Sequence, residues 1–155
     1  PGPTAGAAAT GEHSRPVVLC TLGFVLLYYV FLMGQATVPH VVHELAAARA
    51  KKAGKGAEAP TFTQVKYGGA GGVLVLCGDR TVGNCLEQGV PLLALLWAHA
   101  WLVDVRTAVG LGWCWVAARA LYPFAFLRGV VLFVTVPNYT ALAALAVPLA
   151  LRAGL

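Results

Sequence analysis

Charged residues are scarce in this chain. They make up 11% of its 155 residues, whereas 59% are hydrophobic; ordinary soluble domains carry about 25% charged and roughly 45–50% apolar residues. This composition excludes a typical water-soluble domain. Charge-poor apolar runs recur at about residues 17–34, 89–103, 107–122 and 129–151. Each approaches the roughly 20 helical residues that cross a hydrocarbon core of about 30 Å.

The apolar runs also lack the alternation of polar and apolar residues that barrel strands require, so helices are favoured. We therefore predict an all-α integral membrane protein. The predicted fold is a four-helix bundle with an extended first helix, a long first loop, and spans at about 17–34, 83–104, 106–122 and 129–151. Residues 17–155 would form one membrane domain, preceded by an irregular leader over residues 1–16 that is rich in Ala, Gly and Pro.

The connections between the predicted spans also have a recognisable pattern. The first helix is expected to continue beyond the membrane, with a kink or break at Pro39. A connection containing "KKAGKGAEAP" and "KYGGAGG" runs from Lys51 to about Gly78, and both stretches are flexible by composition. The second helix is expected to begin near Arg80. Pro123 disfavours helix at the preceding Tyr122 and marks the end of the third helix.

Several functional classes lack their motifs. No CxxC pair occurs among the four cysteines, so neither a zinc site nor a disulfide framework is predicted. His40, His43 and Glu44 share a helical face but form no complete ligand set, so no metal is predicted. The basic residues form a short cluster without interleaved aromatics, which argues against nucleic acid as a partner. His99, among leucines and tryptophans, is expected to hydrogen-bond between helices rather than to relay protons.

The net charge of +5 is unevenly placed along the chain. Seven of the eleven cations fall in the first and third connections, whereas three, Arg15, Arg106 and Arg152, lie on the opposite side. Because cytoplasmic loops carry an excess of Lys and Arg, this asymmetry predicts the first and third loops on the cytosolic, stromal or matrix side. The membrane itself would be an endomembrane or an organellar membrane.

A polar stripe opens the second apolar run. At about 100° per residue, Arg80, Asn84, Glu87 and Pro91 fall within about 60° of one another on one helical face. Pro91 has no N–H, so the carbonyl of Glu87 loses its helical donor. An arginine, an amide and a carboxylate can together hold a small zwitterion. The alternative is an interfacial arginine beside an Asn and a Glu that bond to a neighbouring helix.

A second pair of polar residues ends the third predicted span. Arg119 and Tyr122 lie one turn apart in "AARALYP", about a turn from the same membrane face as Arg80. One reading is that they complete a cationic, aromatic-lined pocket. The other is that Arg119 pairs with Glu87 as a buried structural ion pair.

These two motifs, "RTVGNCLEQGVP" and "GLGWCWVAARALYP", resemble those of the membrane-associated proteins in eicosanoid and glutathione metabolism, the MAPEG family of microsomal glutathione transferases. The resemblance covers about residues 80–139. It implies a homotrimer of four-helix subunits with glutathione, a co-substrate, held between them. By position, it implies glutathione-binding roles for Arg80, Asn84, Glu87, Arg119 and Tyr122.

The chain departs from the family pattern at several positions. Many active relatives carry an arginine where this chain has Cys77, an aromatic where it has Gln88, and a second tyrosine where it has Phe126. The arginine that some relatives use to lower the pKa of the thiol is replaced by apolar sequence. Arg128 is the nearby candidate for this catalytic role, which matters because the thiolate is the nucleophile.

Two functions remain open from the sequence. The first is a glutathione transferase or peroxidase that acts on lipophilic electrophiles, reached from surrounding lipids, by thiolate attack. The second is a catalytically silent subunit of the same fold, serving as a structural or linking component among other membrane subunits. A transporter or channel is disfavoured, because His99 is the single ionisable residue near the middle of a predicted span.

Overall fold

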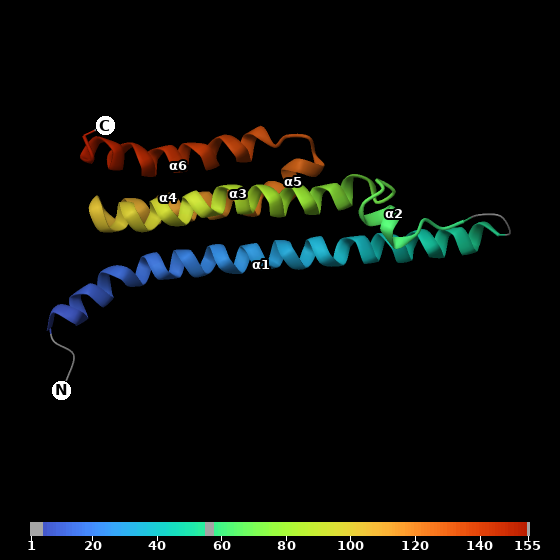
Figure 1. Ribbon diagram of the computed structural model, residues 1–155, viewed down its shortest axis with the longest axis horizontal. Coiled ribbons are helices and arrows are strands. Elements are labelled where there is room, and N and C mark those ends of the chain that lie inside the picture. The colour runs from blue at the N-terminus through green and yellow to red at the C-terminus, as the bar shows by residue number, and fades with distance from the viewer. Residues whose placement is uncertain (1–4, 55–57, 155) are drawn as a thin grey trace.

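The computed structural model describes residues 5–54 and 58–154 and is built from helices (Figure 1). In chain order these are α1 (Ala5–Ala53), α2 (Phe62–Lys66), α3 (Gly72–Leu102), α4 (Val105–Ala120), α5 (Tyr122–Leu127) and α6 (Leu132–Arg152). No strand occurs within these described ranges. The predicted all-α class is confirmed.

Helix α1 is 49 residues long, about 73 Å at 1.5 Å per residue, and extends well beyond the other helices (Figure 1). Of the kink or break predicted at Pro39, the break is wrong, since helix continues through this residue; the kink stays a prediction. Pro39 frees the carbonyl of Gln35 from its helical bond, and the ammonium of Lys66 donates to that carbonyl at 3.4 Å. A partner from another element therefore satisfies the group that the proline exposes.

The irregular leader predicted over residues 1–16 is also a point of difference. Helix begins at Ala5, while residues 1–4 lie outside the described part of the chain. Ala-rich sequence propagates an existing helix readily, because the costly step is nucleation and the long α1 has already completed it. The content of Ala, Gly and Pro alone therefore does not predict irregular structure in this segment.

Helix α3 begins at Gly72, eight residues before the predicted start near Arg80. The stretch "VLVLC", which lies in the predicted connection, forms the first turns of α3. Val75 and Cys77 in this stretch are buried. Gly72 has a φ of 63°, which a glycine adopts without strain and which turns the chain into the helix. The N-terminus of the short α2 is capped by a capping box between Thr61 and Gln64.

The C-terminal elements follow the predicted order. Asp104 caps α4 by accepting from the backbone N–H of Thr107. Helix α4 ends at Ala120 and Pro123 lies in the first turn of α5, which agrees with the predicted end of the third helix. Helix was disfavoured at Tyr122 itself, and there the prediction is wrong, since Tyr122 begins α5. Helix α6 contains Pro137 and Pro148 within its 21 residues and coincides closely with the fourth predicted span.

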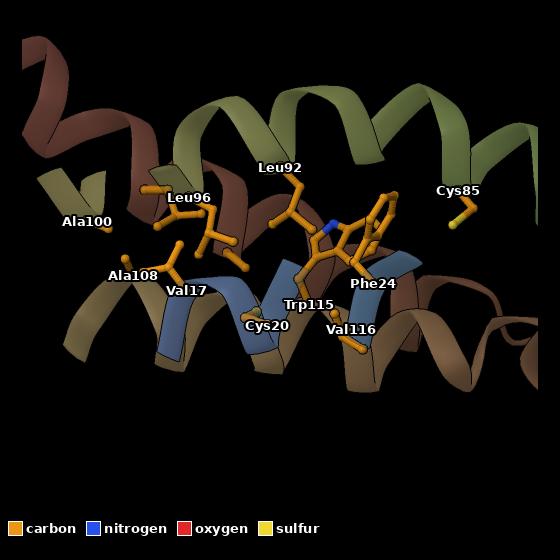
Figure 2. Packing of buried hydrophobic residues seen from close by; sticks show 12 residues of the cluster. Val17, Cys20, Phe24, Cys85, Leu92, Leu96, Ala100, Ala108, Trp115 and Val116 are labelled. Carbon is orange, nitrogen blue, oxygen red and sulfur yellow. The ribbon is translucent and has the colours of Figure 1, made fainter. Parts of the chain in front are cut away.

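Four long helices, α1, α3, α4 and α6, pack around a common apolar core (Figure 2). Side chains with no exposed surface come from α1 (Cys20), α3 (Leu92, Leu96), α4 (Trp115) and α6 (Leu145). Small residues allow close approach: a Cβ added at Gly112 would lie 2.7 Å from the sulfur of Cys20. The core therefore fixes α3 and α4 against α1.

Two of the described helices are long and apolar enough to cross a membrane: α1 from Ser14 onward and α6. The crossing of the bilayer by α3 and α4 stays a prediction. Helix α1 begins and α6 ends at the same end of the bundle, while α2 and the start of α3 lie toward the other (Figure 1). Helix α5, which begins with Tyr122, also lies toward that second end (Figure 1).

Candidate functional site

Helix α3 carries an open pocket of about 370 Å³ on its outward face. It is lined by Leu76, Asp79, Arg80, Gly83, Asn84 and Glu87. Arg80 and Glu87 are exposed and Asn84 is half-buried. The three polar residues of the predicted stripe therefore line a single depression, because residues at i, i+4 and i+7 return to the same face; Pro91 is not among the lining residues.

Asn84 connects this pocket to α5. Its side-chain nitrogen donates to the hydroxyl of Tyr122 at 2.8 Å and to the backbone carbonyl of Arg80 at 2.9 Å. Tyr122 is 6% exposed, so it lies in the protein interior, on the inner side of Asn84. The structure thus brings Tyr122 to the predicted site through a hydrogen bond, although Tyr122 does not line the pocket.

Arg119 is placed differently from either prediction. It is 1% exposed, and its Nη2 donates to the side-chain oxygen of Gln88. Its guanidinium lies 5.1 Å from the ring centre of Trp115 and 5.2 Å from that of Tyr122. These cation–π contacts and the amide partner offset part of the cost of burying the charge.

The ion pair predicted between Arg119 and Glu87 is therefore wrong within one subunit. Neighbouring helical residues point about 100° apart, and here Gln88 turns inward while Glu87 faces the pocket. Gln88 was visible in the sequence as a departure from the family pattern, but its role was missed. The feature that could have indicated this contact was an amide directly after Glu87, on the helical face that turns toward Arg119.

Asp79 is a second residue that the sequence did not indicate. It lines the pocket, and its Oδ1 accepts from Gln35 at 2.8 Å and from the ammonium of Lys66 at 3.4 Å. These contacts tie α1 and α2 to α3 beside Arg80. Their partners are 44 and 13 residues away in sequence, so no local spacing could have revealed them.

Arg128 lies at the C-terminal cap of α5 and is exposed. It is not among the residues that line the pocket. Cys77, at the position where relatives carry an arginine, is buried, with its thiol 3.6 Å from the carbonyl of Pro123. Within the described part of the chain, Arg80 is the cation that lines the pocket itself.

Three of the four histidines have structural partners. His99 is buried, and its Nδ1 donates to the carbonyl of Leu145 at 2.9 Å, which confirms the predicted interhelical bond. His43 donates through Nδ1 to the carbonyl of Pro60 at 3.1 Å. The ring of His40 stacks on that of Phe62, with 4.5 Å between the ring centres. Among residues whose positions are described, no three metal-ligating side chains gather at one point.

Comparison with known proteins gives one match. The model of the family described as "MAPEG family" matches residues 16–153, nearly the whole chain. No curated protein and no solved structure matches the chain. The family match covers the pocket on α3 and the buried arginine on α4 alike.

Proposed function

We propose, because this chain belongs to the MAPEG family, that its pocket on α3 binds glutathione within a membrane. The family acts in eicosanoid and glutathione metabolism, and the apolar helices α1 and α6 agree with an integral membrane protein. The observation that carries the proposal is the joint placement of Arg80, Asn84 and Glu87 in one pocket. Glutathione is a tripeptide with carboxylate, ammonium and peptide groups.

The dimensions of the pocket support a tripeptide. Arg80 and Glu87 are seven residues apart, which is about 10 Å along a helix. Three extended residues span about 10 Å. Arg80 can take a carboxylate and Glu87 the ammonium, with Asn84 between them to meet a peptide group.

The proposed chemistry is thiolate attack on a lipophilic electrophile. In transfer, the thiol loses its proton, a carbon–sulfur bond forms, and any leaving group departs with the electron pair of its bond. In the peroxidase variant, the thiolate attacks a lipid hydroperoxide and releases an alcohol; a second glutathione then displaces water to give the disulfide. Both need a cation near the sulfur, for which the candidates are Arg80 in the pocket and Arg128 at the end of α5.

Arrangement in the membrane is part of the proposal. The cations of the α1 extension, with Lys66, Arg80 and Arg128, would face the cytosol, stroma or matrix of an endomembrane or organelle. A homotrimer would let a neighbouring subunit close the open pocket. Arg119 would then support the site indirectly, by packing against the ring of Tyr122, whose hydroxyl accepts from Asn84.

Calorimetric titration of glutathione into the detergent-purified protein tests this proposal. Micromolar-to-millimolar binding is expected for the wild type. Arg80→Ala and Glu87→Ala should each weaken it at least about tenfold, because each removes the partner of a charged group, a contact of about 1.5–3 kcal/mol.

Arg49→Ala and Glu44→Ala are matched controls for charge. Both residues are exposed on α1, beyond Gln35 and away from the pocket. They should leave the dissociation constant within about twofold, because solvent and salt screen charges at that separation. Heat absent from wild type and variants alike would show that the polar stripe is a helix-pairing device.

A second function, a catalytically silent linking subunit, is favoured by one observation on α1. Beyond Gln35, this helix contacts the following connection through His43, whose Nδ1 bonds to the carbonyl of Pro60, while Val41 and Leu45 are 57% and 54% exposed. Such an apolar stripe on a protruding helix suits a partner protein. Without such a partner, Val41 and Leu45 would be exposed to water.

This second function predicts a different result from the first. Val41→Asp together with Leu45→Asp should release the protein from a larger assembly in gently solubilised membranes, as measured by native gel mobility. Glutathione binding should be unchanged. A wild-type protein that migrates as a free monomer or homotrimer would argue against a linking role.

A further inference from the structure

Asp79 brings a second acid into the pocket on α3. Among the described residues that line this pocket, the ionisable ones are two acids, Asp79 and Glu87, and one base, Arg80. Glutathione carries two carboxylates and one ammonium, so it is itself an anion. Because like charges repel, the carboxylate of Asp79 opposes such a ligand unless a further cation offsets it.

The ammonium of Lys66, from α2, supplies this cation. Its Nζ lies 3.4 Å from Oδ1 of Asp79. The side chain of Lys66 is 17% exposed and that of Asp79 is 41% exposed, so the base lies on the protein side of the pair. Lys66 itself does not line the pocket, and it therefore acts on the pocket through Asp79.

Contacts within the protein hold Lys66 in this position. The preceding residue, Val65, is 1% exposed and anchors α2. The Lys66 ammonium also donates at 3.4 Å to the backbone carbonyl of Gln35, which Pro39 frees in α1. The side chain of Gln35 donates to the same oxygen of Asp79 at 2.8 Å. Lys66 is thus ordered beside Asp79 independently of any ligand, which lowers the entropic cost of binding.

We propose that Lys66 is a positioning residue of the glutathione site, which offsets the charge of Asp79 so that a ligand carboxylate can bind to Arg80, the next residue of α3. This proposal rests on the proposed glutathione site and adds to it a residue from another helix. Packing of α2 against α1 and α3 is thereby coupled to the affinity of the pocket for an anionic ligand.

Removal of the charge of Lys66 tests the proposal. Calorimetric titration of glutathione into the detergent-purified protein should show about fivefold weaker binding for Lys66→Met than for the wild type, because the carboxylate of Asp79 then repels an anionic ligand at a partly solvated site. Lys66→Arg keeps the charge and should bind glutathione within about twofold of the wild type.

A double variant separates the effect of charge from an effect on structure. Asp79→Asn removes the acid, so in the Lys66→Met background it should restore the dissociation constant to within about twofold of the wild type. A purely structural role for Lys66 predicts no rescue, because the contact between α2 and α3 stays broken. The ratio between Lys66→Met and the wild type should also fall below about twofold in about 1 M salt, where the Debye length is about 3 Å.

Lys52→Met is the matched control. Lys52 is exposed in the last turn of α1, 17 residues beyond Gln35 and so about 25 Å away along the helix. This variant should bind glutathione within about twofold of the wild type, since the distance exceeds the Debye length of about 10 Å in 0.1 M salt.

The outcomes also separate this inference from the proposed function. If the wild type binds glutathione and Lys66→Met binds it equally well, or if Asp79→Asn brings no rescue, the role of Lys66 proposed here is wrong while the glutathione site stands. If the wild type does not bind glutathione, the proposed function fails and this inference fails with it. A loss in Lys66→Met that both Asp79→Asn and high salt reverse supports both.

Discussion

The buried contact between Arg119 and Gln88 gives a quantitative prediction. Both residues are nearly inaccessible, at 1% and 5% exposure, so water cannot replace a lost partner. Gln88→Leu would leave a buried guanidinium without its amide acceptor, because the amide is replaced by an apolar side chain of similar size. Hydrogen bonds to charged groups contribute about 1.5–3 kcal/mol. We expect Gln88→Leu to lower the free energy of unfolding by about 2–3 kcal/mol.

A double-mutant cycle isolates this contact. Arg119→Leu removes the charge itself, so Gln88→Leu should cost much less in its presence, and the coupling energy should be at least about 1 kcal/mol. Glu87→Leu is the neighbouring control; because Glu87 is exposed and makes no described ion pair, it should change stability by less than about 0.5 kcal/mol. Unfolding is measured by denaturant titration in micelles. Equal losses for Gln88→Leu and Glu87→Leu, or strict additivity in the cycle, would refute the reasoning.

Two further predictions concern helix packing and helix capping. Gly112→Ala should destabilise the bundle by about 1–3 kcal/mol, because the added methyl would lie 2.7 Å from the sulfur of Cys20; Gly110→Ala on the same helix meets nothing within 4 Å and should stabilise α4 by up to about 1 kcal/mol. Equal effects in thermal unfolding would contradict this packing. Hydrogen bonds from Thr107 lower the pKa of Asp104, so its stabilising effect is complete above the pKa of the unfolded carboxyl. It is lost as the pH falls through the lower folded pKa, and Asp104→Asn should flatten that acid limb of a stability titration.

The sequence correctly placed the three polar residues of the stripe on one face, because the information needed for this is local. Arg80, Asn84 and Glu87 lie on one helix, and helical periodicity places them on one face whatever the rest of the fold does. The all-α class follows in the same way from continuous apolar runs. These predictions needed no knowledge of which helix packs against which.

The remaining features depend on contacts between distant segments. Asp79 is defined by Gln35 and Lys66 from two other elements, and Arg119 by Gln88 from another helix. The first turns of α3 bury Val75 and Cys77, and Lys66 donates to the Gln35 carbonyl that Pro39 exposes in α1. Local propensity is overridden by tertiary contacts at each of these places.

The proposed glutathione site is the pocket on α3, and filling that pocket tests the proposal most directly. Gly83 lines the pocket, and nothing lies within 4 Å of a Cβ added there, so Gly83→Trp should occupy the space without disturbing the fold. Gly110→Trp adds the same side chain to an open position on α4. Calorimetry should detect glutathione binding to the wild type and to Gly110→Trp, and none to Gly83→Trp. An unchanged dissociation constant in Gly83→Trp would contradict the assignment of the site.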